Sequence, residues 1–146
     1  MRLTLHTDYA LRVLLYLGLN QSRRASIREI AERYQISENH LVKVVHRLGQ
    51  GGFVTTVRGK GGGLVLARSP DDIRVGDVVR FAEEDMALVA CLQAGQSCLL
   101  TGACRLQHVL GDALEAFMAV LDRQTLADLL APPEFSKLAG RLKVPE

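Results

Sequence analysis

The only three cysteines of this 146-residue chain, Cys91, Cys98 and Cys104, lie within fourteen consecutive residues, CLQAGQSCLLTGAC. An odd number of thiols cannot all pair in intrachain disulfides. Three thiolates with one further ligand are a common donor set for a metal ion or an iron–sulfur cluster. Because the spacing lacks a paired CxxC motif, it favours an iron–sulfur cluster and leaves a zinc ion or redox-sensing free thiols as alternatives.

The N-terminal segment, MRLTLHTDYALRVLLYLGL, has neither the uninterrupted apolar run of a membrane span nor the cleavage site of a signal peptide. Asp8 and Arg12 interrupt it. We therefore expect a cytoplasmic protein, with no membrane partner. Thiols stay reduced in that compartment, which favours metal or redox chemistry over structural disulfides.

Charge is divided unevenly along the chain, although the net charge is only +2. Residues 1–70 carry eleven basic and four acidic side chains, a charge of +7. The remaining residues carry seven basic and twelve acidic side chains, a charge of −5. This division suggests that the first half of the chain faces a polyanion such as DNA.

The first half has the helix signals of a helix-turn-helix. Apolar residues predict a first helix that ends near residues 18–20. Ser26, with Glu29 three residues later, has the form of a capping box at the start of a second helix. Ser37 would cap a third helix, ENHLVKVVHRL. Two short helices joined by a tight turn are typical of this motif, and the later helix enters the major groove.

A glycine-rich segment, FVTTVRGKGGGLVLAR, follows and predicts a β-hairpin with Arg58 and Lys60 at its tip. A hairpin in this position is the wing of a winged helix, and a basic tip can enter the minor groove. A strand follows the glycines where a nucleotide-binding loop would need a helix, so we set that alternative aside. The predicted DNA contacts are Ser37, Asn39, His40, Lys43, Arg47, Arg58 and Lys60.

The second half predicts a linker helix, VGDVVRFAEE, and then the cysteine segment. From Arg105 to Leu121 apolar residues recur every three or four positions, which predicts a long amphipathic helix. Pairing with the same helix of a second subunit would bury its apolar stripe and match the two-fold symmetry of a palindromic operator. Folding back onto its own domain is the alternative.

The predicted fold class is therefore mainly α with a small β-hairpin: a winged helix-turn-helix domain plus a long dimerisation helix. We expect the DNA-binding domain at residues 1–70 and a linker helix with a cluster-binding loop at 71–104. The dimerisation helix and a short helix opened by Thr125 occupy 105–131, and 132–146 form a mobile tail.

Several segments together resemble the Rrf-type winged-helix regulators that carry an iron–sulfur cluster. They are LTLHTDYALRVLLYL, SENHLVKVVHRL, VRGKGGGLVLAR, IRVGDVV, the cysteine run with ACRL, and LDRQTLADLL. Within that family the chain looks most like the nitric-oxide-sensing repressors, and the regulators of iron–sulfur biogenesis are the nearest relatives. The resemblance covers nearly the whole chain, to about Leu130.

The resemblance implies a homodimer with one cluster per subunit, held by Cys91, Cys98 and Cys104. It implies Asp8, donated by the partner subunit, as the fourth ligand. His108 is the alternative, although its C-x3-H offset is longer than the family's pattern. A 4Fe–4S cluster is favoured over a 2Fe–2S cluster, and the longer first cysteine gap is a departure that bears on cluster type.

The function implied is that of a repressor of nitric-oxide stress genes, not an enzyme, which leaves double-stranded DNA when nitric oxide nitrosylates the cluster. An aspartate oxygen is a hard ligand and would be the easiest of the four to lose. The alternatives are a regulator that senses cluster redox state or iron–sulfur supply, and a thiol or zinc sensor. An electron-transfer protein fits the cysteines but leaves the winged helix unexplained.

Overall fold

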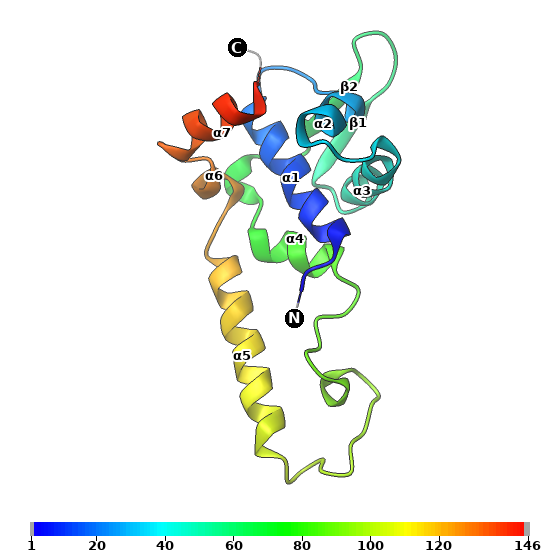
Figure 1. The fold of residues 1–146 in the computed structure, drawn as a ribbon, viewed down its shortest axis with the longest axis vertical. Coiled ribbons are helices and arrows are strands. Elements are labelled where there is room, and N and C mark those ends of the chain that lie inside the picture. Colours follow the sequence, from blue (N-terminus) through cyan, green and yellow to red (C-terminus); the bar gives the residue numbers. More distant parts are fainter. Residues whose placement is uncertain (1, 145–146) are drawn as a thin grey trace.

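The computed structural model describes residues 2–144 and shows a mainly helical chain with one two-stranded sheet (Figure 1). The first residue of the predicted domain 1–70 and the last two of the predicted tail 132–146 lie outside the described residues. Within the described part, no helix is both long and apolar enough to cross a membrane. The predicted fold class is confirmed.

Three helices form the helix-turn-helix core: α1 (Leu5–Leu19), α2 (Ile27–Tyr34) and α3 (Glu38–Gln50). Local capping sets their starts, since the Thr4 side chain accepts a hydrogen bond from the Thr7 amide and Ser26 accepts one from the Glu29 amide. The turn after α2 begins at Gln35, whose φ of 55° is left-handed and ends the helix. The helix boundaries therefore follow the signals in the sequence.

The wing is an antiparallel hairpin of β1 (Val54–Val57) and β2 (Gly63–Leu66), with Val54 opposite Leu66 and Val57 opposite Gly63. Its tip turns through Gly59 and Gly61, which have φ of 94° and 75°. Ala25, before α2, pairs with Leu64 and so adds a single bridge to the outer edge of β2. This bridge joins the wing to the helix-turn-helix.

Helix α1 lies at the centre of the core and packs against α3, α4 (Val75–Ala82), α6 (Leu126–Leu129) and β2. Its inner face is fully buried, and the other elements each contribute apolar side chains. A short 3-10 helix, η1 (Pro70–Asp72), leads from the wing into α4. The largest buried side chains are Tyr16, Leu14, Leu17, Ile30, Leu41, Leu48, Leu64 and Ile73.

The long helix predicted after the cysteines is α5 (Arg105–Asp122), and it extends away from the body of the molecule (Figure 1). Near its N-terminal end Gln107 donates a hydrogen bond to the Cys91 carbonyl, and its C-terminal half packs against α4. There Arg80 forms two hydrogen bonds of 2.6 Å to the Asp122 carboxylate. A Cβ on Gly76 would lie 1.8 Å from Oδ1 of Asp122, so a larger residue at position 76 would displace the Asp122 carboxylate from this pairing.

The C-terminal segment corrects one prediction. Residues 132–146 were expected to form a mobile tail, but Glu134–Leu142 form helix α7. Leu138, Leu142 and Val144 pack against the main core, at a spacing that places the first two on one helix face. The two prolines lie in the turn between α6 and α7, and the chain continues after them as a helix. Thr125 and Asp128, as predicted, cap α6 reciprocally.

Candidate nucleic-acid interface and cysteine loop

Four predicted DNA contacts lie exposed at the N-terminal end of α3: Ser37, Asn39, His40 and Lys43. Ser37 occupies the N-cap position, but among the described residues its hydroxyl makes no capping hydrogen bond. That hydroxyl is therefore available to a base or a phosphate. The His40 ring lies 6.2 Å from the ring of Tyr9 on α1, which places an aromatic group beside this surface.

Val42 was missed by the sequence analysis and belongs to the same surface. It is 47% exposed, whereas its neighbours Leu41 and Val44 are buried. An exposed aliphatic side chain on a recognition helix can contact the methyl group of thymine. The signal was present in the sequence, because Val42 lies about 100° around the helix from Leu41 and so falls outside the apolar stripe.

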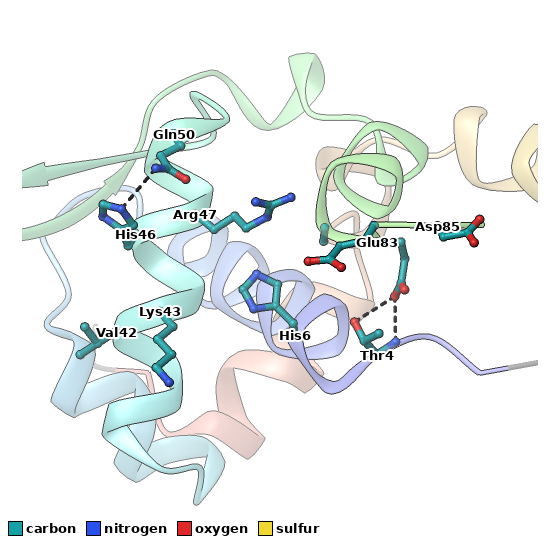
Figure 2. Close-up of a pocket in the computed structure, with 11 residues that line it drawn as sticks. Thr4, His6, Val42, Lys43, His46, Arg47, Gln50, Glu83 and Asp85 are labelled. Carbon is teal, nitrogen blue, oxygen red and sulfur yellow. Dashed lines mark hydrogen bonds between the residues drawn. The ribbon is translucent and has the colours of Figure 1, made fainter. Parts of the chain in front are cut away.

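Arg47 lies further along α3 than these exposed side chains. Sequence analysis expected it to contact DNA, but it is half-buried and its guanidinium points toward the end of α4 (Figure 2). It donates a 3.3 Å hydrogen bond to the carbonyl of Phe81 and lies 5.1 Å from the centre of that ring. Its charge and planar face are thus used to join α3 to α4. Its role as a DNA contact stays a prediction.

Arg58 and Lys60 are exposed at the tip of the wing, as predicted. The tip is narrow, since the Gly62 amide donates to the Gly59 carbonyl at 3.0 Å and a Cβ on Gly62 would lie 2.3 Å from the Val57 carbonyl oxygen. A loop this thin, with two cations, has the size and charge to follow a DNA groove. The wing and the start of α3 make up the candidate nucleic-acid interface.

Beside α3 lies a groove of about 770 Å³ (Figure 2). Lys43, His46 and Arg47 of α3 form its basic wall, and Glu83 with Asp85 form part of the opposite, acidic wall. The groove therefore separates the recognition helix from the start of the segment that carries the cysteines.

Glu83 connects that segment to α1. Its Oε1 atom accepts hydrogen bonds from the Thr4 amide at 2.7 Å, the Thr4 hydroxyl at 3.1 Å and the Thr7 hydroxyl at 2.5 Å. Burial acts to raise the pKa of Glu83, but the hydrogen bonds from Thr7 and Thr4 outweigh it and the pKa is lowered. Because Glu83 is also the C-cap residue of α4, it links the ends of two helices.

His6 lies in the same groove and has a lowered pKa, first because of burial and then because of the nearby charge of Arg47. Glu83 opposes this shift. A lowered pKa favours the neutral imidazole. His6 therefore adds little positive charge to the groove at neutral pH.

The three cysteines lie on the cysteine loop (residues 83–104), which runs outside the main body and contains the short 3-10 helix η2 (Ala90–Leu92) (Figure 1). All three are free thiols; Cys98 is exposed and the other two are half-buried. The loop turns at Gly95 and Gly102, whose φ values are 79° and 87°. Two hydrogen bonds that hold it are from Gln107 to the Cys91 carbonyl and from the Cys98 amide to Thr101.

The structure does not bring the predicted ligands together within one chain. In residues 2–144, no three His, Cys, Asp or Glu side chains are close enough to hold a metal ion. The donor chemistry nevertheless fits an iron–sulfur cluster, because three unpaired thiols share one loop and Cys104 is directly followed by α5. The thiols would have to be gathered by the group they bind. His108 is exposed in the first turns of α5.

Asp8 lies in the first turn of α1, with 42% of its side chain exposed. It forms an ion pair with Arg12 one turn later, at 2.9 Å. Arg12 in turn lies 5.8 Å from the Tyr34 ring, and the Tyr34 hydroxyl donates to the Arg12 carbonyl at 3.0 Å. Burial raises the pKa of Tyr34 to about 12, so this hydroxyl remains a donor. Asp8 is thus accessible to another subunit and is connected to α2.

The sequence matches the Rrf2 family, described as an iron-dependent transcriptional regulator, over residues 3–132. The chain belongs to the Rrf2 family. The HTH-type transcriptional regulator NsrR of Bacillus subtilis strain 168 is 49% identical over 136 residues, which cover 92% of this chain and 93% of that protein. NsrR of Geobacillus kaustophilus is 52% identical and covers 89% of this chain and 90% of its own length.

Solved structures support the same assignment. CymR (YrzC), the global cysteine regulator of B. subtilis, superposes with a TM-score of 0.75 at 28% identity and covers 88% of this chain and 95% of its own. IscR of T. potens superposes with a TM-score of 0.70 at 30% identity and covers 89% of this chain and 86% of its own. The resemblance drawn from the sequence motifs is confirmed. This Rrf2-family chain is a DNA-binding transcriptional regulator and not an enzyme.

Proposed function

We propose that this chain is a homodimeric repressor of nitric-oxide stress genes whose DNA binding is controlled by an iron–sulfur cluster. The observation that carries the proposal is the presence of three free thiols on one exposed loop of an Rrf2-family winged helix. Relatives that are 49% and 52% identical carry the name NsrR, which supports nitric oxide as the signal. The proposed ligands are Cys91, Cys98, Cys104 and Asp8 of the partner subunit.

The DNA contacts in this proposal come from two elements. The N-terminal end of α3 would enter the major groove, where Asn39, His40 and Val42 face base edges. Ser37 and Lys43 would contact phosphates or bases, and Arg58 and Lys60 would enter the adjacent minor groove. The +7 charge of residues 1–70 supports binding to a polyanion.

A second subunit would complete the molecule. The N-terminal half of α5 exposes aliphatic side chains, with Leu106 63% and Val109 55% exposed. Pairing of this surface with its copy would bury these side chains and place two recognition helices about a two-fold axis, as a palindromic operator requires. The predicted dimerisation helix therefore stays a proposal that the exposed apolar surface supports.

The cluster, when bound, would supply iron atoms that react with nitric oxide. Three thiolates and one carboxylate form an uneven set of ligands, since oxygen is the hardest donor among them. This set favours a 4Fe–4S cluster in our proposal, with the carboxylate as the ligand that is released first. Asp8, which forms an ion pair with Arg12 at 2.9 Å, would have to exchange this partner for the cluster.

Two contacts would transmit this change to the DNA-binding surface. Asp8 pairs with Arg12, which contacts Tyr34 at the end of α2. The cysteine loop begins at Glu83, which holds the start of α1 through Thr4 and Thr7. A movement of either contact shifts α1, on which α3 packs. The two recognition helices would then no longer match successive major grooves.

The test is operator binding by anaerobically purified protein, titrated with nitric oxide. We expect brown wild-type protein to bind the operator and to lose affinity when nitric oxide is added. Asp8→Ala should retain the three thiols but show altered visible absorption and a smaller response to nitric oxide. Glu134→Ala is the matched control, because Glu134 is also an exposed acid with a neighbouring cation, Lys137, but lies on α7.

Two outcomes would contradict the proposal. If the purified protein were colourless and contained stoichiometric zinc, an iron–sulfur cluster would be excluded. If operator affinity stayed unchanged after the cluster had reacted with nitric oxide, the sensing role would be excluded.

A cysteine-thiol sensor is the second candidate, and the specific observation in its favour is the exposure of Cys98 in a fold that superposes on CymR. In that case metal-free protein would bind the operator, and thiol oxidation alone would release it. Operator affinity should be compared for the oxidised, reduced, nitric-oxide-treated and metal-free forms. This comparison distinguishes our proposal from the thiol sensor. It also distinguishes our proposal from a sensor of redox state or iron–sulfur supply.

A further inference from the structure

We propose that Arg24 is a positioning residue for DNA binding: it holds the tip of the wing at a fixed angle to α3 without contacting DNA itself. The inference rests on the proposed role of the wing in DNA binding. It assigns a function to a basic side chain that lies outside both α3 and the wing, in the connection between α1 and α2.

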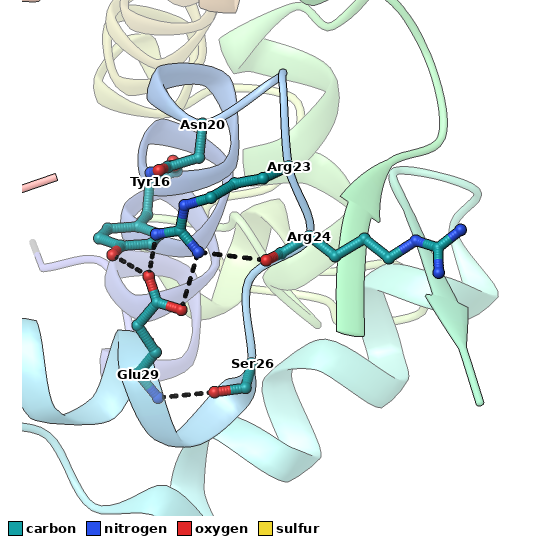
Figure 3. Close-up of polar contacts among 6 residues, drawn as sticks. All are labelled: Tyr16, Asn20, Arg23, Arg24, Ser26 and Glu29. Carbon is teal, nitrogen blue, oxygen red and sulfur yellow. Dashed lines mark hydrogen bonds and ion pairs between the residues drawn. The ribbon is translucent and has the colours of Figure 1, made fainter. Parts of the chain in front are cut away.

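The contact that carries the proposal spans 37 positions in the sequence. Nη1 of Arg24 donates a 2.9 Å hydrogen bond to the carbonyl oxygen of Gly61. In Figure 3 the Arg24 side chain extends away from the neighbouring Arg23 and Glu29 toward the hairpin. An exposed arginine has many conformations, and this one is directed at the backbone of the wing tip.

The start of β2, directly after the tip, is fixed by the same segment. Ala25 and Leu64 exchange two backbone hydrogen bonds, of 3.2 and 2.7 Å. At Gly63 a Cβ would lie 2.8 Å from the Ala25 carbonyl oxygen, so the two strands can approach this closely only because Gly63 has no side chain. Within the tip, the Gly62 amide donates a hydrogen bond to the Gly59 carbonyl. Arg24 extends the connection from the start of β2 to Gly61 in the tip.

Arg24 is itself held at its backbone. Arg23 forms an ion pair with Glu29 and donates a 3.2 Å hydrogen bond to the Arg24 carbonyl (Figure 3). Glu29 also accepts a hydrogen bond from the Tyr16 hydroxyl of α1, and its amide is capped by Ser26. The connection therefore runs from α1 and α2, through Arg23 and Arg24, to the wing.

This arrangement has a consequence for affinity. A loop of glycines loses conformational freedom when it enters a groove, and any contact that orders the loop beforehand reduces that cost. Arg24 would order the loop in this way through its hydrogen bond to the Gly61 carbonyl. Arg58 and Lys60, on either side of Gly59, would then meet the DNA in one geometry.

The first experiment needs no DNA. Trypsin cleaves after Arg58 and Lys60, so the rate of these two cuts in the purified protein reports how often the wing tip opens. Arg24→Ala should raise that rate about fivefold, the equivalent of one hydrogen bond. Arg28→Ala is the matched control, because Arg28 is an exposed arginine whose partner is Glu32 one turn away. Equal cleavage rates in the two variants would overturn the proposal.

The second experiment distinguishes a positioning role from a phosphate contact. Arg24→Ala should weaken operator binding about fivefold and leave the salt dependence unchanged, whereas loss of a phosphate contact reduces the slope by about 0.9. In an Arg58→Ala/Lys60→Ala background the same substitution should have no effect, since Arg24 acts through these residues. Additive effects with a reduced slope would overturn the inference. Wild-type protein that binds no DNA would defeat the proposed function, while the cleavage experiment would still decide the role of Arg24.

Discussion

In the winged-helix domain (residues 2–70) apolar side chains from several elements converge on α1, whereas the cysteine loop and the first half of α5 leave theirs in solvent. Ala10 and Val13 are fully buried, but Leu99 is 105% exposed. The winged-helix domain buries its apolar side chains within its own chain. In our proposal the second region carries the ligands of a cluster, and a second subunit would cover its exposed apolar side chains.

The sharpest way to test this difference is to remove one thiol. Cys98→Ala should abolish the binding of the iron–sulfur cluster, because two thiolates and one carboxylate are too few ligands. The winged helix should stay folded, since Cys98 is exposed. Iron content and visible absorption measure the first effect, and circular dichroism measures the second. Ser97→Ala, at the neighbouring exposed position, should leave both unchanged; full iron content in Cys98→Ala would remove this residue from the ligands.

A pair of leucines compares the stability of the two regions. Leu41→Ala should lower the free energy of unfolding by about 2–5 kcal/mol, because it leaves a cavity beneath α3. Leu99→Ala in the cysteine loop should change it by less than about 0.5 kcal/mol in the metal-free protein. Urea unfolding measures both. If the two substitutions had equal effects, the loop would be packed in solution and the contrast would fail.

The smallest effect concerns Glu29, which supports the winged helix by an ion pair. The hydrogen bond from Arg23 lowers the pKa of Glu29, burial opposes the shift, and the hydrogen bond from Tyr16 adds to the lowering. Its folded-state pKa lies below the ordinary 4.5, so its stabilising contribution is complete above that pH and is lost as the pH falls through the folded-state value.

Glu29→Gln should therefore be less stable than wild type at neutral pH, and the difference should shrink as the pH is lowered below 4.5. Thermal unfolding over this range measures it. Glu32→Gln serves as the control, since Glu32 pairs with Arg28 on the exposed face of α2. A difference that stays constant with pH would show that the charge of Glu29 is not involved.

Much of the winged helix could be predicted because its signals are local. Ser26 and the glycines of the wing each act within a few residues, and the structure has the expected cap and hairpin; the same holds for Thr125 at the start of α6. Glu29 shows the limit of this reasoning. Its amide is capped by Ser26 as expected, but its carboxylate turns to Arg23 and Tyr16.

The features that the sequence could not predict depend on contacts between distant segments. The hydrogen bond from Arg47 to the Phe81 carbonyl joins residues 34 positions apart. Residues 132–146 begin with two prolines and were expected to be mobile, yet Leu138 and Leu142 pack against the core. These contacts form only when the surfaces of other helices are in place. The local sequence around Arg47 or in residues 132–146 therefore does not predict them.

Helix α1 has its N-cap Thr4 and Asp8 at one end and Tyr16 toward the other. Each added residue would turn one end relative to the other by about 100° and lengthen the helix by about 1.5 Å. Its helical phase is thus constrained at both ends, whereas residues 93–97, between the first two thiols, lie in neither a helix nor a strand. We expect insertions and deletions during evolution to accumulate between Cys91 and Cys98 and to be excluded from α1.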